Sequence, residues 1–284
     1  MHKHRFVDKH PIGGSILTGF FLLLINEALR TLMYFIHIAV FKEILPVFSI
    51  LYMLIGAFIT FFIYKQWFAP EFAGALSGGS FKKGLLLSLP IIVYWIVTTA
   101  SMIVDKVFEL KPVTMTVLLV SLTAGLGEEL AFRHGMISTM LRKHNREDQL
   151  LKVLLISSMV FGFFHLFNIV VGADPLSTLI QVITSCSLGI FFGSLYLCSG
   201  NLWPSIIVHT LHDIVAICTT AAVSESGVIT GGFSLSDIVD VIGCAALAVL
   251  AIVRYLSADK RKEIVEIWDR KWNRDDTETV TEEV

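Results

Sequence analysis

Residues 114–136 read TMTVLLVSLTAGLGEELAFRHGM, an apolar run that contains two adjacent carboxylates, Glu128 and Glu129, and an arginine, Arg133. A run of about 20 mostly apolar residues is long enough to cross a bilayer as a helix. Ionisable side chains near the bilayer centre cost about 2.5–3.5 kcal/mol each on insertion scales, so they mostly face a bundle interior or a water-filled cavity. The stretch therefore predicts a membrane helix that contributes to a polar functional site.

The composition of the whole chain is that of a membrane protein. Hydrophobic residues make up 55% of the 284 residues, charged residues only 16%, and the mean hydropathy is +0.73. Soluble domains contain about 25% charged residues. The net charge of −2 says nothing about nucleic acid, but no basic cluster is accompanied by an aromatic-rich soluble domain, so no nucleic-acid partner is expected. The four cysteines lie in apolar stretches without C-x-x-C spacing, which indicates neither a disulfide framework nor a zinc–cysteine site.

The apolar runs predict an all-α fold, a polytopic membrane helix bundle of about eight transmembrane helices. The basic start of the chain resembles a signal peptide, but Asn26, Glu27 and Arg30 interrupt the apolar run and no small-residue cleavage site follows, so we expect a retained first span. Lysine and arginine concentrate in alternate loops, which predicts that both termini are cytoplasmic. The expected spans are 14–40, 46–67, 84–104, 114–136, 151–172, 176–198, 203–223 and 236–256.

Residues 1–256 are expected to form a single transmembrane bundle without an internal repeat or a soluble domain. Gly189 and Gly193 form a G-x-x-x-G pattern, which would let a neighbouring helix approach closely. Residues 257–284 are predicted to form a cytoplasmic tail, with an amphipathic helix on the inner leaflet and an acidic, disordered end. The apolar residues at helical spacing in this tail are Ile264, Val265, Ile267, Trp268 and Trp272.

The two carboxylates of the fourth span are expected to differ in role. Adjacent residues point about 100° apart on a helix, so Glu128 and Glu129 cannot serve one small site equally. Glu129 and Arg133 are four residues apart on one face and can form an ion pair, which offsets part of the cost of burial. Glu128 then remains as the freer carboxylate and is the candidate general base. The alternative is a helix–helix salt bridge without chemistry.

Two further polar patterns follow along the chain. Phe161-x-x-x-His165 places a histidine in an aromatic membrane helix, where it is either a hydrogen-bonded packing residue or part of the site. His209 and Asp213 lie at i and i+4 on one helix face, where they can hold a metal or a water, or the carboxylate can fix the histidine tautomer. His212 is expected to point elsewhere.

Together the three patterns resemble the signature of the CPBP family, the membrane-embedded proteases that include the CAAX prenyl endopeptidases and the bacteriocin-processing or abortive-infection proteins. The family is marked by E-E-x-x-x-R, F-x-x-x-H and H-x-x-x-(N/D). Here these read Glu128-Glu129-x-x-x-Arg133, Phe161-x-x-x-His165 and His209-x-x-x-Asp213. The resemblance covers about residues 114–220, the expected protease-like core of the bundle.

The resemblance implies an intramembrane endopeptidase that hydrolyses a peptide bond with an activated water. Glu128 and His165 would activate the water, and His209 and Asp213 would stabilise the tetrahedral oxyanion or complete a metal site. The prenyl-protein proteases generally carry asparagine where this chain has Asp213, and an ionised aspartate cannot donate a hydrogen bond. Asp213 would then act protonated, orient His209 or bind a metal. A divalent metal such as zinc would have His165, His209, Asp213 and Glu128 as its possible ligands.

Two other functions compete with proteolysis. The chain could be a regulator or immunity protein that binds a membrane kinase, a peptide pheromone or a bacteriocin without cutting it. It could also be a transporter, since membrane carboxylates and histidines relay protons, although the inverted repeat that would support this is absent. For the protease, the expected partners are the lipid bilayer and a peptide or membrane-protein substrate. The short, loop-poor chain favours a bacterial plasma membrane and a secreted-peptide precursor.

Overall fold

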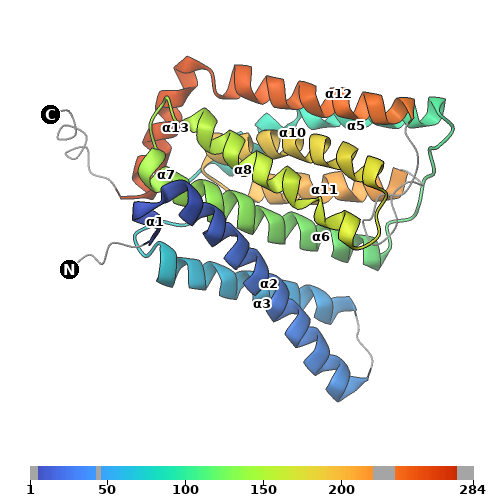
Figure 1. Ribbon diagram of the computed structural model, residues 1–284, viewed down its shortest axis with the longest axis horizontal. Helices are drawn as coiled ribbons and strands as arrows, with labels where there is room; N and C mark the ends of the chain where they lie inside the picture. The colour runs from blue at the N-terminus through green and yellow to red at the C-terminus, as the bar shows by residue number, and fades with distance from the viewer. Residues whose placement is uncertain (1–5, 43–45, 220–233, 274–284) are drawn as a thin grey trace.

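The computed structural model describes residues 6–42, 46–219 and 234–273, and these residues are helical or in connecting turns and loops (Figure 1). The helices are α1 (Phe6–Lys9), α2 (Pro11–Phe41), α3 (Pro46–Ile63), α4 (Phe81–Ser88), α5 (Pro90–Val104), α6 (Met115–Glu128), α7 (Thr139–His144), α8 (Leu150–Phe164), α9 (Phe167–Val170), α10 (Pro175–Ser199), α11 (Trp203–Thr219), α12 (Leu235–Leu250) and α13 (Ala258–Lys271). Three π-helical segments extend α3, α6 and α12 without a break, at Tyr64–Phe68, Glu129–Ser138 and Ala251–Tyr255.

The helices confirm an all-α membrane bundle. Within the described ranges, seven helical runs are long and apolar enough to cross a bilayer. The expected span 203–223 corresponds to α11, which has 17 residues up to Thr219, and its last four residues lie outside the described part. The fourth span is longer than expected, because α6, the π-helical segment and α7 continue as one helical run from Met115 to His144.

The bundle is arranged around α10. This helix is the most buried of the seven and packs against α8, α12, α4 and α11. On one flank, α2 and α3 pair with each other and extend away from the remaining helices (Figure 1). On the opposite flank, α12 packs against α5. The helices between these flanks, α6, α8, α10 and α11, include those that carry the three polar patterns.

Small residues set the contact between α8 and α10, as the G-x-x-x-G pattern predicts. A Cβ atom on Gly189 would lie 3.1 Å from Ser158, and one on Gly193 would lie 2.6 Å from Leu154. From the α8 side, a Cβ on Gly162 would lie 2.2 Å from the sulfur of Cys186. A side chain at these glycines would therefore force the two helices apart.

The fifth expected span corresponds to the helical run Leu150–Val170, which contains a turn that affects the site. The sequence predicts a continuous helix over 151–172, but α8 ends at Phe164, and His165 is its C-terminal cap. The chain turns there and continues into the short helix α9. His165 therefore lies at a helix end, where its side chain is less restricted by neighbouring turns than in mid-helix.

The helix predicted in the tail is present, and its apolar side chains pack on the rest of the protein. In α13, the side chains of Ile264 and Trp268 belong to the main hydrophobic core. Nε1 of Trp268 donates to the carbonyl oxygen of Leu197 at 3.0 Å. The ammonium group of Lys271 donates to the carbonyl oxygens of Gly74 and Ser77, at 2.7 Å each, and burial lowers its pKa to about 8. The apolar face of α13 thus packs on protein, and the acidic end predicted after it lies outside the described residues.

Candidate functional site

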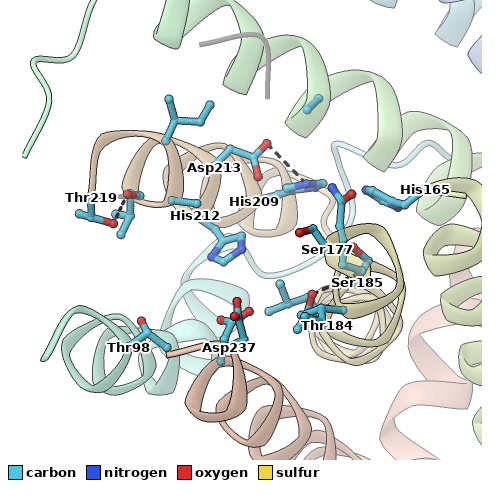
Figure 2. A pocket seen from close by; sticks show the side chains of 18 of the residues that line it. Thr98, His165, Ser177, Thr184, Ser185, His209, His212, Asp213, Thr219 and Asp237 are labelled. Carbon is cyan, nitrogen blue, oxygen red and sulfur yellow. Dashed lines mark hydrogen bonds and ion pairs between the residues drawn. The ribbon is translucent and has the colours of Figure 1, made fainter. Parts of the chain in front are cut away.

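A cavity of about 620 Å³ lies among α5, α6, α8, α10, α11 and α12. It brings together side chains from all three polar patterns. Figure 2 labels those of His165, His209 and Asp213. Glu128 lies near the middle of the 30-residue helical run Met115–His144, away from both ends of the expected span. The predicted site residues that line the cavity are Glu128, His165, His209 and Asp213.

The two adjacent glutamates lie in different surroundings, as their spacing predicts. The side chain of Glu129 is fully buried, whereas that of Glu128 is 19% exposed and lines the cavity. Glu129 forms the predicted ion pair with Arg133, with 3.0 Å between Oε1 and Nη1. Only Glu128 is therefore in a position to meet a molecule in the cavity.

Arg133 is held by aromatic rings and a backbone carbonyl as well as by Glu129. Its guanidinium carbon lies 4.4 Å from the centre of the Phe161 ring and 5.8 Å from that of Phe192. Nη2 approaches the carbonyl oxygen of Gly189 at 3.4 Å. Cation–π contacts of this kind are stronger where the cation is desolvated. Arg133 itself does not line the cavity, so its contribution to the site is made through Glu129.

His209 is oriented by Glu129, a contact that the sequence patterns do not show. Nδ1 of His209 lies 2.9 Å from Oε1 of Glu129, the same oxygen that pairs with Arg133. A carboxylate paired with arginine is an acceptor only, so the proton of this hydrogen bond is on Nδ1. The sequence had assigned the orientation of His209 to Asp213 as one possibility. In the structure, Glu129 makes the close contact and Asp213 lies on the other side of the ring.

The second nitrogen of His209 faces the cavity between two carboxylates. Nε2 lies 3.7 Å from Oε2 of Glu128 and 3.8 Å from Oδ2 of Asp213, too far for direct hydrogen bonds. The imidazole ring stacks on Phe192 with 5.0 Å between ring centres. Figure 2 shows His209 and Asp213 projecting from the same helix, α11. A small molecule or a substrate oxygen could be bound between these three side chains.

His165 faces the same cavity from the end of α8. Its Nδ1 lies 3.0 Å from the carbonyl oxygen of Phe161, and a carbonyl oxygen only accepts, so Nδ1 carries the proton. In the neutral ring, Nε2 is then an acceptor. The Phe161 ring packs edge-on against both histidines, with its centre 5.1 Å from that of His165 and 5.9 Å from that of His209. Asn168 does not orient the His165 ring through its amide, which donates to Gln181 at 2.8 Å.

The cavity extends to α5 and α12, which the sequence analysis did not connect with the site. His212, expected to point elsewhere, also lines it, and its Nδ1 lies 3.2 Å from Nε1 of Trp95. Asp240 accepts a hydrogen bond from the hydroxyl group of Tyr94 at 2.5 Å. The available signal was the pair of aspartates, Asp237 and Asp240, at the start of the eighth expected span. Like the other carboxylates in apolar spans, each of them would need a hydrogen-bond donor or a cation nearby.

The arrangement does not fit a preformed zinc site. Zinc needs three protein ligands within about 2.0–2.3 Å of one point. Across residues 6–42, 46–219 and 234–273, no group of three His, Cys, Asp or Glu side chains is close enough to hold a metal ion. The chemistry considered below therefore uses only the side chains.

A comparison with known protein families identifies the stretch that carries the site. Residues 110–215 match the family model described as Type II CAAX prenyl endopeptidase Rce1-like. No curated protein and no solved structure matches the chain. The matched stretch begins just before α6, ends within α11 and contains Glu128, His165, His209 and Asp213. Over these residues the chain is similar to the CAAX-type family of membrane-embedded proteases.

Proposed function

We propose that this protein is an intramembrane endopeptidase in which Glu128 and His165 activate a water molecule that attacks a peptide bond. The observation that carries the proposal is the convergence of Glu128, His165 and His209 on one cavity inside the bundle. Hydrolysis inside a membrane needs such a protein-lined cavity, because lipid supplies neither water nor hydrogen-bond partners.

In the proposed reaction, Glu128 is the general base. Its carboxylate takes a proton from the water as the water oxygen bonds to the carbonyl carbon of the substrate, and a tetrahedral oxyanion forms. Glu128 then returns this proton to the amide nitrogen, the C–N bond breaks, and a carboxylic acid and an amine leave; the acid then gives its proton to the amine. The partial exposure of Glu128 toward the cavity supports this role, and the complete burial of Glu129 argues against the same role for its neighbour.

The two histidines, both packed against the Phe161 ring, assist the reaction. In the neutral form of His165, Nε2 accepts a hydrogen bond and can hold the attacking water. The Nδ1 proton of His209 is engaged by Glu129, so a second proton on Nε2 converts the ring into a donor for the oxyanion. Preorganised donors of this kind contribute about 10²–10³-fold in rate each. The carboxylates of Glu128 and Asp213, both near Nε2, support the protonated ring by their charge.

A second pocket supports a substrate that comes from the bilayer. This pocket, about 750 Å³, lies between α2, α3 and α6 and is lined mainly by apolar side chains. Glu128 and Phe164 line both pockets, so the second one leads to the proposed base. We propose that an apolar part of a membrane-associated peptide occupies it during cleavage.

The proposal is tested with purified protein in liposomes and two kinds of peptide: one ending in a prenylated cysteine motif, and one with an apolar leader. Mass spectrometry should find cleavage of at least one peptide by the wild type, and none by Glu128→Gln or His165→Ala at equal protein level. Glu147→Gln, an exposed glutamate outside the cavity, is the matched control and should retain activity. Undiminished cleavage by Glu128→Gln would overturn the proposal, and binding without cleavage by the wild type would favour a regulator.

Chelators separate this mechanism from metal catalysis. Because no described group of side chains fits zinc, activity should survive dialysis against EDTA and 1,10-phenanthroline within about twofold. Activity that is lost on dialysis and restored by zinc alone would contradict the side-chain mechanism. Elemental analysis of the purified protein, before and after dialysis, provides the control.

A further inference from the structure

His212 is directed into the same cavity as the proposed catalytic residues. It lies three residues after His209 on α11, a spacing that places Cβ atoms about 5–6 Å apart on neighbouring parts of a helix surface. Both imidazoles pack on Phe192, His209 in a stack at 5.0 Å and His212 edge-on at 6.4 Å. Figure 2 shows His212 extending from α11 toward the side of the pocket where Thr98 and Asp237 lie.

The tautomer of His212 is fixed by Trp95. The indole N–H of tryptophan can only donate, so Nδ1 of His212, 3.2 Å from Nε1 of Trp95, is the acceptor. In the neutral ring, the proton is therefore on Nε2. No described residue accepts a hydrogen bond from this Nε2–H group.

The three cavity histidines therefore differ in which ring nitrogen carries the proton. In their neutral forms, His165 and His209 carry the proton on Nδ1, toward Phe161 and Glu129, and present a bare nitrogen to the cavity. His212 alone of the three presents an N–H group. An oxyanion needs donors, and the neighbouring carboxylates of Glu128 and Asp213 can only accept when ionised.

We propose that Nε2–H of His212 is a second hydrogen-bond donor to the oxyanion, a catalytic residue that supplies what the carboxylate of Asp213 cannot. The proposal rests on the endopeptidase function proposed above. Trp95 is then a positioning residue, since its indole keeps the proton of His212 on the nitrogen that faces the cavity. Because His212 needs no second proton for this role, it donates at any pH at which the ring is neutral.

The first experiment compares kcat and KM for the substrate that the wild type cleaves. His212→Ala should lower kcat by about 10²–10³-fold with KM changed by less than about threefold, the pattern for a donor used only in the transition state. His212→Gln, whose side-chain amide keeps a hydrogen-bond donor, should lower kcat by a smaller factor than His212→Ala. His10→Ala, at an exposed histidine outside the cavity, is the control and should match the wild type.

The second experiment restores a donor at the neighbouring position. Asparagine at position 213 carries an amide N–H, so the double variant His212→Ala/Asp213→Asn should regain at least tenfold in kcat over His212→Ala alone. Trp95→Phe should lower kcat by about tenfold, because the ring of His212 can then exchange its tautomers. Trp203→Phe, at a half-exposed indole outside the cavity, is the matched control.

The outcomes separate this proposal from the function on which it rests. If Glu128→Gln is inactive while His212→Ala keeps kcat within about threefold, the endopeptidase stands and the role of His212 is overturned. If His212→Ala fails to fold in a thermal-unfolding assay, His212→Gln and Trp95→Phe decide: kcat unchanged in both overturns the role, and kcat lowered in Trp95→Phe supports it. If the double variant is no more active than His212→Ala, a donor function is contradicted.

Discussion

In the part of the chain that the structure describes, two glutamate–arginine pairs lie within single membrane helices, and they have different surroundings. Glu27 and Arg30, three residues apart on α2, form an ion pair of 2.6 Å with side chains that are 36% and 38% exposed. Glu129 and Arg133 form a pair of 3.0 Å with side chains that are 0% and 1% exposed. In the sequence, both are oppositely charged residues on one helix face.

The difference lies in what surrounds each pair. The buried pair has a third partner, because Oε1 of Glu129 also contacts His209, and Arg133 is enclosed by the rings of Phe161 and Phe192. The pair on α2 borders the apolar pocket, and Arg30 contacts Glu27 through both Nε and Nη2. Burial and the link to a cavity histidine, rather than pairing itself, make the Glu129–Arg133 pair part of the site.

The largest effect is expected from Arg133→Ala. It leaves the carboxylate of Glu129 buried without its cation, which should lower the free energy of unfolding by about 3–5 kcal/mol. Denaturant unfolding in detergent measures this, with Arg30→Ala as the matched variant for the more exposed pair. Equal losses in the two variants would show that burial does not distinguish the pairs.

Glu129→Asp tests the link to His209 with the charge retained. The shorter side chain keeps a carboxylate near Arg133 but cannot hold Nδ1 of His209 at 2.9 Å. A misplacement of about 1 Å can cost on the order of 10²-fold in rate, so kcat should fall by about that factor while the unfolding free energy changes little. Glu147→Asp is the control. If Glu129→Asp keeps the wild-type kcat, Glu129 does not position His209 for catalysis.

Lys271, unlike Arg133, is a buried cation whose hydrogen bonds to the described residues go to backbone carbonyl oxygens and not to a carboxylate. Its pKa in the folded protein, about 8, is below the usual 10.5, so between these values the unfolded chain binds more protons and stability rises with pH. From pH 7 to 9 this contribution is roughly 1 kcal/mol. Thermal unfolding between pH 7 and 9 should show stability rising more steeply with pH in the wild type than in Lys271→Met. Parallel pH profiles for the two proteins would contradict a lowered pKa of Lys271.

The smallest effect is expected from removing both charges of the exposed pair. Glu27→Gln/Arg30→Gln leaves no unpaired charge, so the unfolding free energy should stay within about 1 kcal/mol of the wild type. The single variants should be less stable than the double variant, because each leaves one charge alone. A double variant that is less stable than both single variants would contradict this reading.

The sequence predicted most of the fold and part of the site. Apolar runs of sufficient length located the helices, and helical spacing placed Glu129 against Arg133 and left Glu128 toward a cavity. These inferences depend only on length and on angles within one helix. Contacts between helices were beyond reach, which is why the hydrogen bond from His209 to Glu129 and the position of His212 were not predicted.

Departures from regular α-helix were also not predictable. The segment Glu129–Ser138 is π-helical, a rare form that often marks functional sites, yet its residues are compatible with an ordinary helix. The end of α8 at Phe164 lies inside an apolar run without proline or a nearby charge. The amphipathic pattern of α13 shows one apolar face but not whether lipid or protein covers it.

The position of α13 has a consequence for the order of assembly. The helix α13 follows all the expected spans in the chain, yet Trp268 contacts the backbone of α10 and Lys271 contacts the loop at 74–77. Earlier helices can insert and pair as the ribosome delivers them, but this end of the bundle gains these contacts only after α13 has been synthesised. A chain that stops before Ala258 would therefore leave the backbone carbonyls of Leu197, Gly74 and Ser77 without these donors.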